Sequence, residues 1–432
     1  MSLRVLLLDL THGAEVLARE YLSQGQEVTA VDVYHTAPLA MKRQLREEGI
    51  RVLSAAPREH FDLLVAPVHC PDRYIGGASF DTRLTHHEAV GRLARFSVPV
   101  VEVTGLGAKT STVHLLAHQL AYAGKKVLAL SSRGAFLVDK TGTKVLEPRS
   151  SIAPASVLRM SKVRMGQDIA VLEVSLGGTG SADVGIITSL SHDYHIAQGT
   201  RRASDGKKQM LTLMKEGGTA LFPAAEKDIW LPHLPQGRRA ITFGRGGDVQ
   251  LLLPEDMRLG QPVHAAFRCP ECLYGFSMPG DFLGAAYSTA LEASFAALMA
   301  MNENLDLAME SLEHFHGIPG RGELQARQGG WTIKERNPGV SASSLEYLVS
   351  VLERDYGIRD LGVVVDPVSV KVCEKLDLKA IRDALGQHPS VEGLYLSENA
   401  PEQHEGFELI ASQKDAEYKH EVLLWCMKEG FT

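Results

Sequence analysis

Chemistry in this chain is concentrated in one loop, Thr104-Gly105-Leu106-Gly107-Ala108-Lys109-Thr110-Ser111, which follows an apolar run at 98–104. A strand, a glycine-containing loop and a helix in this order form a cradle in which backbone N–H groups face a phosphate. In such a cradle Lys109 supplies positive charge to the outer phosphates of a nucleotide, and the Thr110 hydroxyl binds Mg²⁺. The strict pattern G-x-x-x-x-G-K-[ST] is not met, because Val103 and Ala108 stand at its glycine positions. An ordinary turn between a strand and a helix therefore stays open as the alternative.

Glu173 is a second candidate, because it directly follows the apolar run 169–172. The carboxyl ends of parallel strands meet at one edge of a sheet, where ligands bind, and a carboxylate there can hold Mg²⁺. A solvated acid at a strand end is the alternative. His192 and His195 follow the next apolar run, 184–188, and reach the same edge either as further metal ligands or as surface residues.

Two further clusters have open interpretations. Arg201 and Arg202 stand close to Lys207 and Lys208, which indicates either a site for carboxylates or phosphates or a solvated helix start. Cys269-Pro270-Glu271-Cys272 is half of a zinc site, with His264 as a possible third ligand; a turn with two reduced thiols is the alternative.

The elements that must position these residues alternate between strands and helices. We expect strands at 5–10, 27–33, 52–54, 63–67, 98–104, 126–130, 169–174, 184–188, 220–222, 240–243, 331–333, 361–365, 393–397 and 422–426. We expect helices at 14–23, after residue 112, and at 204–214, 285–301, 343–356 and 378–385. Such alternation predicts an α/β fold with parallel sheets. Linkers near residues 97 and 317 divide it into domains 1–97, 98–317 and 318–432.

Composition sets the broad class of the protein. A length of 432 residues suggests two to four domains, and 44% apolar with 22% charged residues is ordinary for a globular chain. The net charge of −7 argues against nucleic acid as a partner. No segment has the length and apolarity of a membrane span, and no signal peptide is apparent. Five cysteines are too few for a disulfide scaffold, so we expect free thiols and a cytoplasmic protein.

Several of these motifs, in this order, resemble the Mur ligase family of ATP-dependent ligases. The family's T-G-x-x-G-K-T-[ST] loop is similar to 104–111, with Ala108 in place of a glycine, and its strand-end magnesium ligand matches Glu173. The family's T-N-x-x-x-D-H segment resembles 188–195, in which His195 fills the histidine position if one residue is inserted. Its often carbamylated lysine falls at Lys208, after Gly199-Thr200.

The resemblance continues into the last third of the chain. The family's G-R-x-E hinge looks like 320–323, so Arg321 is expected to contact the phosphates of ATP, and the nucleotide-binding strand end resembles 334–339, with Glu335 and Asn337. The adenine-binding segment is mostly absent at 280–286. The resemblance implies three domains: a Rossmann-like N-terminal domain, a P-loop ATPase domain and a small Rossmann-like C-terminal domain.

The resemblance also implies roles for these residues. Catalysis falls to Lys109, Glu173, Lys208 and Arg321. ATP is bound by Thr104, Gly105, Leu106, Gly107, Ala108, Lys109, Thr110, Ser111, Arg321, Glu335 and Asn337. Mg²⁺ is bound by Thr110, Glu173 and His195.

One branch of the family fits best: the synthetases that make the nickel-tetrapyrrole coenzyme of methanogenesis. The segments 9–13, 193–197, 199–203 and 337–339 resemble it. This implies a small-molecule substrate, a nickel tetrapyrrole, contacted by Thr11, His12, Gly13, Arg201 and Arg202. It implies phosphorylation of a propionate side chain and closure of a carbocycle by carbon–carbon bond formation. A Mur-like amide ligase and a non-catalytic nucleotide-binding relative are the alternatives, and the sequence makes no prediction of oligomeric state.

Overall fold

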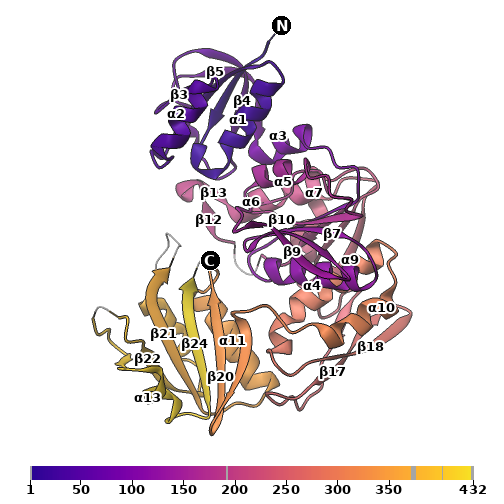
Figure 1. The fold of residues 1–432 in the computed structure, drawn as a ribbon, viewed down its shortest axis with the longest axis vertical. Coiled ribbons are helices and arrows are strands. Elements are labelled where there is room, and N and C mark those ends of the chain that lie inside the picture. Colours follow the sequence, from indigo (N-terminus) through magenta and orange to yellow (C-terminus); the bar gives the residue numbers. More distant parts are fainter. Residues whose placement is uncertain (1, 191–192, 371–375, 401, 430–432) are drawn as a thin grey trace. The chain divides into compact units, whose positions relative to one another are not determined.

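The computed structural model describes residues 2–190, 193–370, 376–400 and 402–429, and Figure 1 shows their course. The chain divides into two compact units. The first unit comprises residues 1–247 and 296–303, and the second comprises 248–295 and 304–432. Each unit is described by itself.

The first unit begins with a five-stranded parallel sheet of order β3-β2-β1-β4-β5. Its elements are β1 (Arg4–Leu8), α1 (Ala14–Ser23), β2 (Glu27–Val31), α2 (Leu39–Glu47), β3 (Arg51–Leu53), β4 (His60–Ala66), β5 (Ser79–Thr85) and α3 (His86–Leu93). Side chains of a strand alternate between two faces, and both faces of β1 are buried. Val5 and Leu7 pack in one hydrophobic cluster, and Leu6 and Leu8 pack in another. This explains the continuous apolar run in the sequence.

An eight-stranded sheet follows, with the order β15-β14-β11-β6-β10-β7-β8-β9. Its elements are β6 (Val100–Thr104), α4 (Lys109–Tyr122), β7 (Val127–Ser131), β8 (Gly134–Asp139), β9 (Gly142–Pro148), α5 (Pro154–Met160), β10 (Ile169–Glu173), β11 (Val184–Ile187), β14 (Thr219–Pro223), α8 (Lys227–Trp230) and β15 (Arg239–Phe243). Pairing is parallel from β15 to β7, and β8 and β9 add an antiparallel edge.

The two sheets of the first unit share one core. A single cluster of buried residues contains Val5 and Leu7 of β1 as well as Leu128 of β7 and Leu172 of β10. The contact runs through α5, against which α1 and α3 pack. The boundary near residue 97 is therefore bridged by apolar packing, and it stays a prediction.

Between β11 and β14 the first unit carries short elements. They are β12 (His195–Ile196), β13 (Arg201–Arg202), α6 (Ala203–Lys207) and α7 (Gln209–Thr212). The sequence predicts one helix over 204–214, whereas the structure breaks it at Lys208. Lys207, the last residue of α6, is buried.

The second unit holds two sheets, of order β16-β17-β18 and β19-β20-β24-β21-β22-β23. Its strands are β16 (Gln250–Leu252), β17 (Val263–Cys269), β18 (Cys272–Met278), β19 (Arg321–Arg327), β20 (Gly330–Asn337), β21 (Leu361–Val370), β22 (Val391–Leu396), β23 (Glu408–Leu409) and β24 (Val422–Glu429). Its helices are α10 (Leu305–Glu310), α11 (Ala342–Asp355), α12 (Leu378–Leu385) and α13 (Gln413–Glu417), while α9 (Ser288–Ala300) runs from this unit into the first. The three-stranded antiparallel sheet was not expected from the sequence.

The remaining helices are single 3₁₀ turns. They are η1 (Leu10–His12), η2 (Asp72–Ile75), η3 (Ala197–Gly199), η4 (Ala224–Glu226), η5 (Leu231–His233), η6 (Gly284–Tyr287) and η7 (Ser311–His314). In the part of the chain that the structure describes, no helix has the length and apolarity needed to cross a bilayer.

A buried acid sits in the strand that leads to the loop. Glu102 of β6 is fully buried, and its carboxyl group accepts hydrogen bonds from the backbone N–H (2.8 Å) and the hydroxyl of Thr179. Burial raises the pKa of Glu102 from 4.5 to about 7, although the hydrogen bonds from Thr179 oppose the shift. The folded chain therefore holds the proton more tightly than the unfolded chain.

The contribution of Glu102 to the stability of the first unit should consequently be lost as the pH rises from 4.5 through 7, because the unfolded state releases this proton first. The difference amounts to roughly 3 kcal/mol. We expect Glu102→Gln, which cannot ionise, to change the dependence of the thermal midpoint on pH in calorimetry: relative to the unaltered chain, the midpoint of the variant should rise between pH 5 and pH 8. Glu216→Gln, at an exposed glutamate, is the control and should leave the dependence unchanged. Equal slopes for Glu102→Gln and the unaltered chain would contradict this account of Glu102.

Candidate functional site

Three parallel strands bring the candidate residues to one edge of the large sheet. β6 lies between β10 and β11, with Val103 opposite Glu173 and Thr104 opposite Ile187. The three strands therefore end together, and Thr104, Glu173 and Thr188 meet where the loop 105–108 begins. This is the edge at which parallel α/β sheets bind ligands.

Position 105 requires glycine, because Thr188 at the end of β11 lies too close to leave room for a side chain. A Cβ atom at Gly105 would lie 2.0 Å from Thr188 Oγ1, and the backbone has φ of +140°. The Thr188 hydroxyl lies 2.5 Å from the carbonyl oxygen of Gly107, and Ser189 accepts a hydrogen bond from the Leu106 N–H at 2.9 Å. The strand end at Thr188 thus fixes the shape of the loop.

Ala108 occupies the last loop position in a left-handed conformation, with φ of 58°. An L side chain in this region meets its own backbone, at a cost of roughly 1–2 kcal/mol. Ala108, which stands where the Mur family motif has glycine, is therefore a strained residue. The loop leads directly into the helix α4.

Lys109 and Thr110 open α4 beside Glu173. The Thr110 hydroxyl donates to Glu173 Oε2 at 2.9 Å, and the Ser132 N–H donates to the same oxygen at 3.1 Å. Lys109 Nζ lies 3.9 Å from Glu173 Oε1. A threonine hydroxyl and a buried carboxylate are hard oxygen ligands of the kind that Mg²⁺ prefers, and the N-terminus of a fourteen-residue helix suits a phosphate.

Of two neighbouring lysines, Lys207 is the buried one, whereas the expected Lys208 lies nearer the surface. Lys207 is fully buried, with its ammonium 4.7 Å from the centre of the Tyr194 ring and 3.4 Å from the Tyr194 oxygen. Burial, together with the positive charge of Lys109, lowers the pKa of Lys207 to about 8. Lys208 instead turns toward Asp205, at 2.9 Å, near the surface. The interpretation of Lys208 as the family's modified lysine stays a prediction.

His195 is the predicted second magnesium ligand, and it lies on a different element from Glu173. His195 begins β12, is exposed, and lies opposite Arg202 in a two-stranded ladder. Ser191 and His192 lie outside the described residues, so His192 as a ligand stays a prediction. The role of His195 stays a prediction.

The residues predicted to contact the substrate lie on the N-terminal sheet and on β13. Thr11 shares a hydrogen bond of 2.6 Å with Thr36, and His12 Nδ1 lies 2.6 Å from Asp9. Gly13 has φ of 96°, and a Cβ there would lie 2.7 Å from the Cβ of Ala155, so close packing on α5 accounts for this glycine.

Both arginines of the predicted substrate site have protein partners. Arg201 donates to the Val68 carbonyl at 3.0 Å and to Asp72 at 2.8 Å, which ties β13 to the loops after β4. Arg202 is exposed and donates to the carbonyl of Asp193 at 2.9 Å. The segment 67–75, whose His69 contacts His12, therefore connects Arg201 with His12.

Arg321, Glu335 and Asn337 come together in the second unit. β19 and β20 place Arg321 opposite Glu335, whose carboxylate accepts from the Gly322 N–H at 2.9 Å and from the side chain of Asn337. Burial raises the pKa of Glu335, although Arg321 opposes this shift. Arg321 Nε is buried without a hydrogen-bond partner among the described residues. Such a donor suits an anionic ligand.

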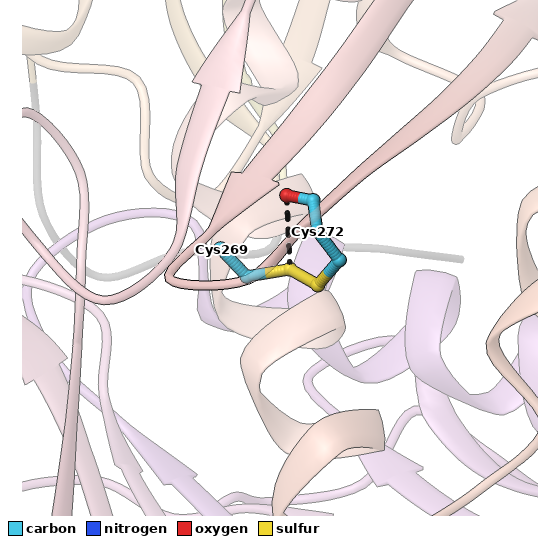
Figure 2. Close-up of a disulfide and its surroundings, with 2 residues drawn as sticks. All are labelled: Cys269 and Cys272. Atoms are coloured by element: carbon cyan, nitrogen blue, oxygen red, sulfur yellow. Dashed lines mark hydrogen bonds between the residues drawn. A yellow bond between two sulfur atoms is a disulfide. The ribbon is translucent and has the colours of Figure 1, made fainter.

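The expectation of free thiols is wrong at two positions. Figure 2 shows Cys269 and Cys272 joined by a disulfide at the tip of the β17–β18 hairpin. The two-residue turn brings their Cα atoms to 5.2 Å, within the usual range for a disulfide. Neither sulfur is then available for zinc. Cys70 and Cys426 are free and buried, as expected.

Sequence comparison identifies relatives over most of the chain. A coenzyme F(430) synthetase of Methanosarcina acetivorans is 33% identical over 415 residues, which cover 86% of this chain and 85% of that protein. A coenzyme F(430) synthetase of Methanocaldococcus jannaschii is 28% identical over 217 residues, or 47% of this chain and 48% of that protein. No protein-family profile matches the chain.

Structural comparison finds the same architecture in the Mur ligases. The MurF ligase of Thermotoga maritima, solved in complex with ADP, superposes with a TM-score of 0.59 at 18% identity and covers 93% of this chain and 91% of that one. The fold is accordingly the three-domain α/β fold of the Mur ligases. The predicted fold class is confirmed.

The strained loop residue gives a direct test of its geometry. Ala108→Gly should raise the free energy of unfolding of the first unit by up to about 1 kcal/mol, because relief of the left-handed strain exceeds the added entropy of the unfolded chain. Denaturant titration measures the change. Ala123→Gly, beyond the end of α4, is the matched control and should not stabilise the chain. Destabilisation by Ala108→Gly would contradict a left-handed residue at position 108.

Proposed function

Because the chain belongs to the coenzyme F(430) synthetases, and is an ATP-dependent ligase, we propose that it activates a propionate side chain of a seco nickel-tetrapyrrole acid and closes a carbocyclic ring. The observation that carries the proposal is the hydrogen bond between Thr110 and Glu173 beside Lys109, at the carboxyl edge of the parallel sheet. This arrangement suits phosphoryl transfer from ATP, which depends on positioning and on neutralising charge.

The proposed reaction has two balanced steps. In the first, an oxygen of the propionate attacks the γ-phosphorus of ATP, the bond to the β-phosphate oxygen breaks, and ADP leaves. In the second, a ring carbon that has lost a proton attacks the acyl carbon, a carbon–carbon bond forms, and phosphate leaves with the acyl C–O electrons. Water must be kept from the acyl phosphate between the steps.

The residues of the chain have separate tasks in this scheme. Lys109 and the N-terminus of α4 neutralise and orient the phosphates. Thr110 and Glu173 would hold Mg²⁺, which supplies positive charge to the phosphate oxygens during transfer. Gly105 and Thr188 keep the loop in register with these groups.

Lys207 is proposed in place of Lys208 as the carbamylated lysine of the family. A buried ammonium near a second ammonium is costly, and the lowered pKa near 8 gives a neutral amine that can attack CO₂. The product is a carbamate, formed with loss of one proton. It would turn repulsion from Lys109 into attraction and provide an oxygen ligand at the same edge of the sheet.

The proposed substrate face is aromatic and basic. Tyr34 and Tyr74 make an edge contact with ring centres 5.4 Å apart, and His12 lies edge-on to Tyr34 at 6.2 Å. Arg73 stacks over Tyr74 at 5.2 Å, and Arg201 approaches the same segment through Asp72. Flat aromatic rings with arginines suit a planar macrocycle that carries carboxylates.

The ligase activity is tested with purified chain, ATP, Mg²⁺ and the seco precursor. We expect one ADP and one phosphate for each ring closed, and Lys109→Ala should reduce the rate by roughly 10²-fold or more because a charge on the transferred phosphate is left uncompensated. Lys125→Ala, at a partly exposed lysine paired with Glu303, is the control. Phosphate release that requires an added amino acid and closes no ring would favour an amide ligase; activity unaffected by Lys109→Ala would contradict the site.

The identity of the modified lysine is tested by a pair of neighbouring variants. Lys207→Ala should lower the turnover by roughly 10²-fold or more, since it removes a metal or phosphate contact, and short carboxylates such as acetate should partly restore it. Lys208→Ala should retain near-normal turnover, because this side chain faces Asp205.

Carbamylation itself is followed by ¹³C resonance after incubation with labelled bicarbonate. The signal should persist in Lys208→Ala and disappear in Lys207→Ala. The reverse pattern would return the role to Lys208.

A further inference from the structure

Asp9, His12 and His69 gather at the carboxyl ends of two neighbouring strands, β1 and β4, away from the phosphate loop. Asp9 directly follows β1, His12 ends the short helix η1, and His69 lies in the loop after β4. Since β1 and β4 are parallel neighbours, their ends bring the three side chains to one place. The potential ligand atoms all lie within 4.8 Å of one another.

The three groups converge on a single carboxylate oxygen. Asp9 Oδ2 lies 2.6 Å from His12 Nδ1 and 3.2 Å from His69 Nε2. The two imidazole rings are 4.7 Å apart and nearly perpendicular, at 83°. The other carboxylate oxygen, Oδ1, accepts a hydrogen bond of 3.0 Å from the Thr11 N–H, which fixes the orientation of the group.

Two features of Asp9 are energetically unfavourable. Its side chain is fully buried, and its backbone is left-handed, with φ of 74° and ψ of 79°. A strained and buried carboxylate is typical of functional sites rather than of packing.

We propose that Asp9, His12 and His69 form a binding site for a divalent first-row transition ion of the Zn²⁺ or Ni²⁺ type. Two imidazoles and one carboxylate are a preferred ligand set for such ions. Metal–ligand bonds of about 2.0–2.2 Å in a tetrahedral site separate the ligand atoms by roughly 3.4 Å. The pair at 3.2 Å nearly meets this separation, and the pair at 2.6 Å reaches it by a small movement of His12, whose side chain is 48% exposed.

The arrangement leaves the site open on one side. Asp9 is buried and His69 is partly exposed, so a fourth ligand would come from the solvent side as water or as a carboxylate oxygen of a bound acid.

The test uses the full chain, produced without a histidine tag and freed of metal by a chelator. Co²⁺ alone is titrated while its visible d–d absorption is recorded, and Zn²⁺ alone is titrated by calorimetry. We expect about one ion per chain and an intense absorption typical of low coordination number. Asp9→Asn and His69→Ala should each weaken binding by at least about 10-fold, the loss that even a supporting residue of a metal site causes.

A second group of potential metal ligands, which contains one histidine and two aspartates, provides the matched control. His60 lies close to Asp62 and Asp81 in the same sheet, but all three side chains are at least partly exposed. His60→Ala should leave the Co²⁺ spectrum and the affinity unchanged. Asparagine tolerates the left-handed conformation at position 9, and circular dichroism checks that each variant is folded; should Asp9→Asn unfold, His69→Ala and His12→Ala decide the question. Absence of binding to the unaltered chain, or binding removed by His60→Ala alone, would overturn the proposal.

Discussion

The site depends on the parallel pairing of β6 with β10 and β11. This pairing makes three strands end together, so that Thr104, Glu173 and Thr188 meet around the loop without any of them being close in sequence. The hydrogen bond from Thr110 to Glu173 and the contact of Thr188 with the Gly107 carbonyl then fix the start of α4. A change in register of one residue would turn Glu173 to the other face of the sheet.

The sequence predicted the parallel framework well, because buried strands and amphipathic helices have strong patterns. The helix 14–23 and the expected strands of the five- and eight-stranded sheets lie within a few residues of their expected places, whereas β5, β8 and β9 were not expected. The antiparallel sheet β16–β18 was missed, since its strands are only partly buried and their alternation is weak. The disulfide was missed because cysteine count indicates a compartment on average and says nothing of a particular two-residue turn.

The candidate site was predictable at the loop and at Glu173, and less so at the lysine. Motif spacing counts residues along the chain and carries no information on burial, so it does not distinguish Lys207 from Lys208. The burial of Lys207 beside Tyr194 is a tertiary property. Gly206 offered a weak signal of the interruption of the helix at Lys208, because glycine destabilises a helix interior.

The account's central claim is that the carboxylate is activated as an acyl phosphate. The most direct measurement uses seco precursor labelled with ¹⁸O in the reacting propionate and follows the label by mass spectrometry of the released phosphate. Attack by a carboxylate oxygen on ATP transfers one labelled oxygen to phosphate in each turnover. Labelled phosphate formed in step with ring closure is the predicted result, and ring closure with unlabelled phosphate would contradict the account.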